Sequence, residues 1–290
     1  MRRHRSPLAL VVAVTLAATL AVTGCGGDDP VTATTAGTST QGGPGATSGS
    51  TDRQPFKREL GPTLCAVAPG LCGGDKVSTP PSVLDDPQQR EQREQKVLED
   101  AGYVARLLNE YWTAELQRVY GVPFGVPGRF EAYRGATAGM TCGGPIPPEQ
   151  TASNAFYCSH DADERVAFDL DWFQGYLADY PGGATTFLIL AHEWGHAVQD
   201  TWDEQGIDPG SGDYRDEIQA DCLAGVFLHA SLRSGALVEK PEDAPAVLGW
   251  LYSAGSSQWL DPRSHGTRQQ RQAAFLLGFN GTTQACQEGF

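Results

Sequence analysis

Apolar residues recur at steps of three and four between Val97 and Val119, which is the spacing of one face of an α-helix. Asp85 and Asp86 stand directly before Pro87, and an acidic residue followed by proline is a typical helix start. A stretch that contains several glycines then ends the pattern. The pattern predicts one long amphipathic helix whose polar first turns face solvent.

The next part of the chain contains shorter runs in which apolar and polar residues alternate, as in half-buried strands. The strand candidates are residues 129–134, 155–158 and 165–173. Helical spacing then returns, and the expected helices are residues 185–200, 214–233, 245–257 and 267–279. We therefore expect residues 85–290 to form one α+β domain, mainly helical, with a small antiparallel or mixed sheet before the helix at 185–200.

The first residues predict that the chain is exported. Three arginines precede a mostly apolar run over residues 7–22, and we interpret residues 1–24 as a signal peptide. Val22-Thr-Gly-Cys25 resembles the lipobox of bacterial lipoproteins, in which the cysteine carries the lipid. A transmembrane helix is the weaker interpretation, because the apolar run ends in small residues and then Cys25.

Two segments separate Cys25 from the domain. Residues 25–54 are rich in Gly, Ser and Thr, with almost no large apolar side chain, so we expect a flexible tether. Residues 55–84 are rich in Pro and Gly and predict an irregular arm. The expected location is the outer face of the cell membrane, held by a lipid on Cys25, with secretion as the alternative.

The charge of the chain limits its partners. It carries 35 acidic and 21 basic side chains, a net charge of −14 at pH 7. This balance argues against nucleic acid as a partner, because phosphate binding needs a basic surface.

Six cysteines remain besides Cys25, and an even number in an exported chain predicts disulfides. A cysteine zinc site is the competing interpretation, but the sequence contains no C-x-x-C pair. We expect each cysteine to pair with its neighbour in order, as Cys65–Cys72, Cys142–Cys158 and Cys222–Cys286.

The helix at 185–200 contains His192-Glu193-Trp-Gly-His196, an H-E-x-x-H pattern. Residues four apart lie on one helix face, so both imidazoles can reach one metal ion while Glu193 reaches a water on it. Apolar residues before His192 predict that the helix packs in the core and holds the histidines rigidly. The alternative is a helix with two structural histidines. The pattern favours zinc, with both histidines as ligands and Glu193 as general base.

A catalytic zinc needs a third protein ligand. A histidine six residues after His196 would supply one in some zinc peptidases, but Trp202 stands there. Glu217 and Asp221 are four apart in an otherwise apolar helix, and buried carboxylates need a metal or a cation. We expect Glu217 to bind zinc and Asp221 to accept a hydrogen bond from a ligand histidine, with Asp221 as the rival ligand.

These motifs together resemble a known family. His192-Glu-x-x-His196 followed by Glu217-x-x-Ala-Asp221-Cys-x-Ala-Gly is similar to the bacterial neutral zinc metallopeptidases, a gluzincin-type group, over residues 85–286. The resemblance implies a zincin-like peptidase fold and one zinc ion on His192, His196 and Glu217. Ala197 departs from the family pattern, where a second histidine is usual.

Asn154-Ala155-Phe-Tyr157 resembles the substrate-binding edge strand of thermolysin-like peptidases. That resemblance implies that Asn154, Ala155 and Tyr157 pair with an extended peptide. An ordinary strand beside a disulfide is the alternative.

His265-Gly-Thr lies before the last expected helix. We expect His265 to help stabilise the oxyanion of a tetrahedral intermediate, and Arg271 to brace the site. A helix-capping or surface histidine is the alternative.

The sequence as a whole therefore predicts a zinc metallopeptidase acting on peptides or proteins outside the cell. A zinc-bound water would be the nucleophile, and Glu193 would take its proton. Two alternatives remain: a catalytically silent zinc-binding envelope protein, and a zinc hydrolase of cell-wall amide bonds.

Overall fold

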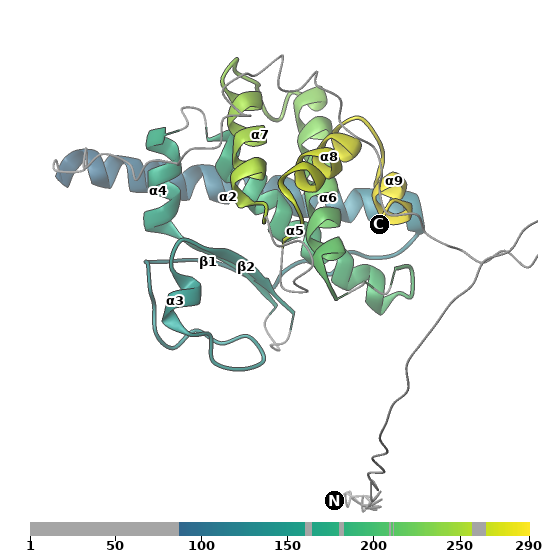
Figure 1. The fold of residues 1–290 in the computed structure, drawn as a ribbon, viewed down its shortest axis with the longest axis horizontal. Coiled ribbons are helices and arrows are strands. Elements are labelled where there is room, and N and C mark those ends of the chain that lie inside the picture. The colour runs from purple at the N-terminus through teal and green to yellow at the C-terminus, as the bar shows by residue number, and fades with distance from the viewer. Residues whose placement is uncertain (1–86, 160–163, 180–182, 209, 211, 257–264) are drawn as a thin grey trace, which may run out of the picture. The chain divides into compact units, whose positions relative to one another are not determined.

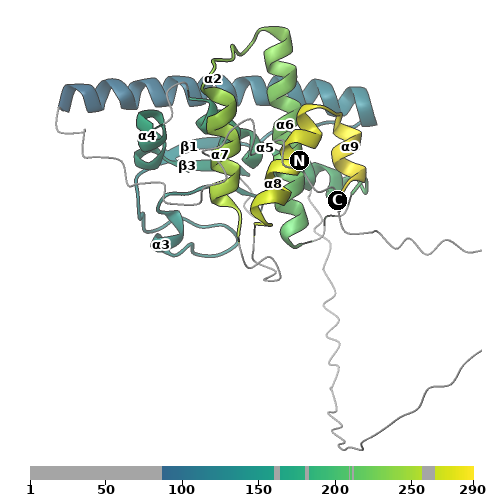
Figure 2. The ribbon, with the colours of Figure 1, turned by 45° about the horizontal axis from the view of Figure 1, so that its top comes forward.

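The computed structural model describes residues 87–159, 164–179, 183–208, 210, 212–256 and 265–290. Its longest element is helix α2 (Pro87–Tyr120), which begins at the predicted proline. The face predicted from the apolar spacing is buried, and most residues of the first two turns are exposed. In Figure 2 the sheet and most of the other helices lie below α2, and α6 crosses it.

The sheet has three strands in the order β1-β3-β2. Strand β3 (Arg165–Asp169) pairs in parallel with β1 (Arg129–Tyr133) and antiparallel with β2 (Ala155–Cys158). The sheet is therefore mixed, and the predicted α+β class is confirmed (Figure 1). Because β2 is an edge strand, one side of its backbone faces away from the sheet.

The third strand is shorter than the expected 165–173. It ends at Asp169, and helix α4 (Leu170–Asp179) follows at once. The carboxylate of Asp169 explains the change, because its Oδ1 accepts hydrogen bonds from the backbone N–H groups of Asp171 and Gly135. A side chain that caps the first turn in this way starts a helix. Two short helices were also not predicted, α3 (Pro148–Thr151) and α9 (Thr283–Glu288).

The remaining helices agree closely with the sequence pattern. Their bounds are α5 (Ala184–Glu204), α6 (Tyr214–Ser234), α7 (Asp243–Ala254) and α8 (Arg268–Phe279). Helix α6 ends at Gly235, whose φ of 76° is the left-handed conformation of a C-cap glycine. Helix α8 begins with the expected capping box, in which Thr267 and Gln270 bond each other's backbone N–H.

Two glycines let the helices around α6 approach each other closely. A Cβ on Gly195 of α5 would lie 2.9 Å from Ala220 Cα of α6, so the two backbones are in close contact there. On the other side of α6, a Cβ on Gly278 of α8 would lie 1.8 Å from the carbonyl oxygen of Cys222. Helix α6 is therefore packed between α5 and α8 at backbone-to-backbone distance.

Two of the three expected disulfides are formed, Cys142–Cys158 and Cys222–Cys286. The first ties β2 to the loop before α3, and the second ties α6 to α9. The expected Cys65–Cys72 pair, the lipid site Cys25 and the segments 1–24, 25–54 and 55–84 all lie outside the described residues. Within the part of the chain that the structure describes, no helix is both long and apolar enough to cross a membrane.

Gly278→Ala is expected to lower the free energy of unfolding by about 1–3 kcal/mol, because the new methyl group forces α6 and α8 apart. Denaturant unfolding of the oxidised protein measures the change. Gly102→Ala in α2 is the matched control. Its Cβ would meet only the end of the Arg106 side chain, at 3.9 Å. Alanine at that helical position should stabilise by up to about 1 kcal/mol. Equal effects of the two changes would contradict the packing described here.

Candidate metal centre

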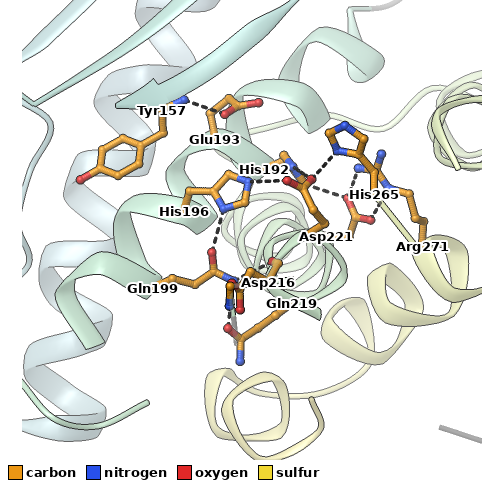
Figure 3. A network of polar contacts seen from close by, with 12 residues as sticks. Tyr157, His192, Glu193, His196, Gln199, Asp216, Gln219, Asp221, His265 and Arg271 are labelled. Atoms are coloured by element: carbon orange, nitrogen blue, oxygen red, sulfur yellow. Dashed lines mark hydrogen bonds and ion pairs between the residues drawn. The ribbon is translucent and has the colours of Figure 1, made fainter. Parts of the chain in front are cut away.

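Helix α5 presents its two histidines on one face (Figure 3). Helix α6 supplies the carboxylate of Glu217 opposite them. His192 Nε2 lies 3.3 Å from Glu217 Oε2, and His196 Nε2 lies 3.8 Å from Glu217 Oε1. One ligand atom from each residue can be chosen so that all lie within 4.8 Å of one another. The structure therefore brings together the three residues that the sequence proposed as metal ligands.

The spacing of these atoms fits zinc. Two ligand atoms that are each about 2.1 Å from a tetrahedral ion lie about 3.4 Å apart. The two distances between the imidazoles and Glu217 are close to this value. Two imidazoles and one carboxylate are also a donor set that leaves a fourth position open in catalytic zinc sites. The residues present therefore fit a catalytic zinc ion.

The other nitrogen of each imidazole has its own partner. His192 Nδ1 lies 2.9 Å from Asp221 Oδ1, and His196 Nδ1 lies 2.8 Å from Gln199 Oε1. Both partners are oxygen acceptors, so each Nδ1 carries a hydrogen, and Nε2 is the nitrogen of each ring that can give up its proton and bind a cation. Asp221 thus lies on the Nδ1 side of His192, whereas Glu217 lies on the Nε2 side.

Asp221 is held by Arg271 as well as by His192. Arg271 Nε donates to Asp221 Oδ2 at 2.7 Å, and Arg271 Nη2 donates to Asp221 Oδ1 at 2.8 Å. Both side chains are buried, and the guanidinium lies over the ring of Trp250. Arg271 therefore braces the site through Asp221.

The electrostatics of the site favour a bound cation. Burial lowers the pKa of His192, but the charge and hydrogen bond of Asp221 outweigh it and raise that pKa to about 10. Burial raises the pKa of Glu217, but hydrogen bonds from His192 and His265 outweigh it and hold that pKa well below its usual range. Glu217 is therefore an anion at neutral pH, which is the form that binds metal.

Glu193 faces the edge strand. Its Oε2 accepts a hydrogen bond of 2.8 Å from the backbone N–H of Tyr157 in β2. Backbone groups alternate along a strand, so the N–H and C=O of Ala155 point to the same side as this N–H, away from β3. The Tyr157–Glu193 bond could not be predicted from the sequence, because the donor is a backbone group that is present whatever the side chain.

The edge strand and the ligands line one cleft of about 510 Å³. Asn154, Ala155 and Tyr157 border it on one side, and Trp250 of α7 borders it as well. The Asn154 side chain itself donates to the carbonyl of Gln150. All three residues expected to bind substrate therefore lie beside the metal ligands.

His265 lies at the same cleft, just before α8. Its Nδ1 is 2.7 Å from Glu217 Oε2, and 60% of its side chain is exposed. His265 therefore contacts a proposed ligand directly, and its ring is open to a substrate.

A family model described as "Putative neutral zinc metallopeptidase" matches residues 88–290. The chain belongs to this family. It is 32% identical to "Uncharacterized protein YpfJ" of Escherichia coli (strain K12) over 172 residues, 51% of this chain and 56% of that protein. It is 33% identical to "Uncharacterized protein Rv2575" of Mycobacterium tuberculosis over 167 residues, 49% of this chain and 55% of that protein. The chain thus spans about half the length of these curated relatives. No solved structure matches it significantly.

A second group of possible ligands is made only of carboxylates, two on α5 and one just before β3. Glu164, Asp200 and Glu204 also place one oxygen each within 4.8 Å of one another, and Tyr157 Oη donates to Asp200 at 3.1 Å. This group contains no imidazole, and exposed acidic groups of this kind are common without a metal. A substitution in this group therefore serves as a control for a substitution of a proposed zinc ligand.

Glu217→Ala is expected to weaken zinc binding by more than about 100-fold, because even the loss of a residue that supports a ligand costs about 10–100-fold. Glu204→Ala should leave zinc affinity unchanged. Competition with a chromophoric chelator measures both values. If Glu217→Ala retained full zinc occupancy, the third ligand would have to be Asp221 or another residue.

Proposed function

We propose that this protein is a zinc metallopeptidase that hydrolyses peptide bonds, with one zinc ion held by His192, His196 and Glu217. The observation that carries the proposal is the position of Glu193. Its carboxylate lies between the histidines in sequence and accepts a hydrogen bond from the edge strand β2. A general base is thus next to both the metal ligands and a strand suited to bind a peptide.

Bound zinc supplies a Lewis acid that polarises a carbonyl group and makes water a nucleophile near neutral pH. Glu193 takes the proton of the attacking water and passes it to the leaving amine. The Tyr157 N–H orients one carboxylate oxygen and so leaves the other for the proton. His265, beside Glu217, stabilises the negative charge that develops on the carbonyl oxygen.

The substrate is an extended peptide segment. The N–H and C=O of Ala155 and the C=O of Tyr157 lie on the free side of an edge strand, where backbone groups pair with an extended chain. The N–H of Tyr157 is bonded to Glu193 instead. Asn154 lies at the start of this strand and lines the same cleft. A cleft of about 510 Å³ holds a few residues rather than a folded domain, so unfolded chains are the better substrates.

We place this activity outside the cytoplasm, at the outer face of the cell membrane, with a lipid on Cys25 as the anchor. The disulfides Cys142–Cys158 and Cys222–Cys286 support export, because disulfides persist in oxidising compartments.

Glu193→Gln tests the proposal directly. This change keeps the metal ligands but removes the base, so zinc content should stay unchanged. Cleavage of an unfolded protein should fall by about 100–10,000-fold, the usual contribution of a general base. Zinc is measured by elemental analysis and cleavage by the release of new amino groups.

Glu204→Gln, on the same helix and exposed, is the control and should keep full activity. A chelator should abolish wild-type cleavage, and added zinc should restore it. Equal activity of Glu193→Gln and the wild type would contradict the assignment of the base. Cleavage of cell-wall fragments but not of unfolded proteins would show an amidase instead.

A further inference from the structure

A chain of side-chain amides runs from the second histidine of α5 into α6 (Figure 3). Gln199 Oε1 lies 2.8 Å from His196 Nδ1. Gln199 Nε2 in turn donates to the backbone carbonyl of Asp216 at 2.7 Å and to Gln219 Oε1 at 2.9 Å. Gln199 thus contacts a proposed zinc ligand at one end of its amide and helix α6 at the other.

The donor and the acceptor in each of these hydrogen bonds follow from groups that can only accept. A backbone carbonyl can only accept, so Gln199 must turn its NH₂ group toward Asp216 and its oxygen toward His196. An amide oxygen can only accept, so His196 Nδ1 must carry the hydrogen. In a neutral imidazole the hydrogen is then absent from Nε2, the atom that faces Glu217.

Gln219 continues this series of hydrogen bonds toward the C-terminal helix α9. Its oxygen accepts from Gln199, so its NH₂ group donates to Asp208 Oδ2 at 2.9 Å and to the carbonyl of Cys286 at 3.2 Å. Both of these partners are acceptors, and Gln219 is buried. Cys286 is fixed to α6 by its disulfide with Cys222. The orientation of Gln219 is therefore determined by groups outside the metal site.

We propose that Gln199 is a positioning residue of the metal site, which together with Gln219 fixes His196 in the Nδ1–H form so that Nε2 is ready to bind the ion. The inference rests on the proposed zinc site and deepens it. His192 is oriented by the carboxylate of Asp221, whereas His196 is oriented by a neutral amide whose direction is set by α6 and the C-terminal segment.

Zinc affinity of three glutamine variants tests this role. Gln199→Met keeps the length of the side chain but removes the acceptor, and it should weaken zinc binding by about 10–100-fold. Gln219→Met should cause a smaller loss, because the Asp216 carbonyl still orients Gln199. Gln272→Met is the matched control, since Gln272 is a buried glutamine in α8 that donates to the Leu248 carbonyl. The control should bind zinc like the wild type.

A second variant and a spectroscopic signal separate positioning from packing. Gln199→Glu keeps an oxygen acceptor for His196 but loses both donations to α6, so it should recover part of the affinity lost in Gln199→Met. In zinc-loaded protein with ¹⁵N-labelled histidine, the Nδ1–H signal of His196 should be present in the wild type and lost in Gln199→Met.

Several results would overturn the inference. Wild-type zinc affinity or an unchanged Nδ1–H signal in Gln199→Met would do so. Equal losses in the Met and Glu variants of Gln199, or an equal loss in Gln272→Met, would assign Gln199 a packing role only. In each of these cases the zinc site itself would stand. A wild-type chain that binds no zinc would overturn the proposed function as well.

Discussion

The carboxylate of Asp221 has no exposed surface, and it binds Arg271 and His192 at once. A buried charge is costly unless it is paired and hydrogen-bonded, so Asp221 requires both partners in place. Each partner comes from a different helix, His192 from α5 and Arg271 from α8. This one carboxylate therefore fixes α5 and α8 relative to α6. Helix α5 carries the two histidines and the proposed base, and α8 carries Arg271 at the cleft.

The close contacts of α6 make this arrangement possible. The Arg271 guanidinium reaches Asp221 because α8 approaches α6 at Gly278, and His192 reaches it because α5 approaches α6 at Gly195. A larger residue at either glycine would move one partner away from a charge that has no access to water. Packing and electrostatics therefore depend on each other here, and the imidazoles are held in place by the core rather than by loops.

The features that could be predicted from the sequence are those that depend on residues close together in the chain. The helical spacing of α2 and α6, the C-cap at Gly235 and the capping box at Thr267 are local, and they are present in the structure. The ligand candidates His192 and His196 were also local, because their spacing on a helix places both on one face. Glu217 could be predicted as a ligand because a carboxylate in an otherwise apolar helix needs a partner.

Several features that depend on tertiary contacts were not predicted. Strand β3 ends early because Asp169 caps a helix, and the alternating pattern up to Phe173 did not reveal this. The hydrogen bond from Tyr157 to Glu193 depends on how β2 lies against α5, which the sequence does not reveal. Gln199 follows His196 by three residues, but its role became visible only with the Asp216 carbonyl beside it.

The coordination of zinc in the purified protein tests the central claim most directly. X-ray absorption at the zinc K-edge should show one ion with two imidazole nitrogens and oxygen ligands at about 2.0–2.2 Å. A shell of sulfur atoms at about 2.3 Å, a third imidazole, or a protein that retains no zinc would contradict a site built from His192, His196 and Glu217.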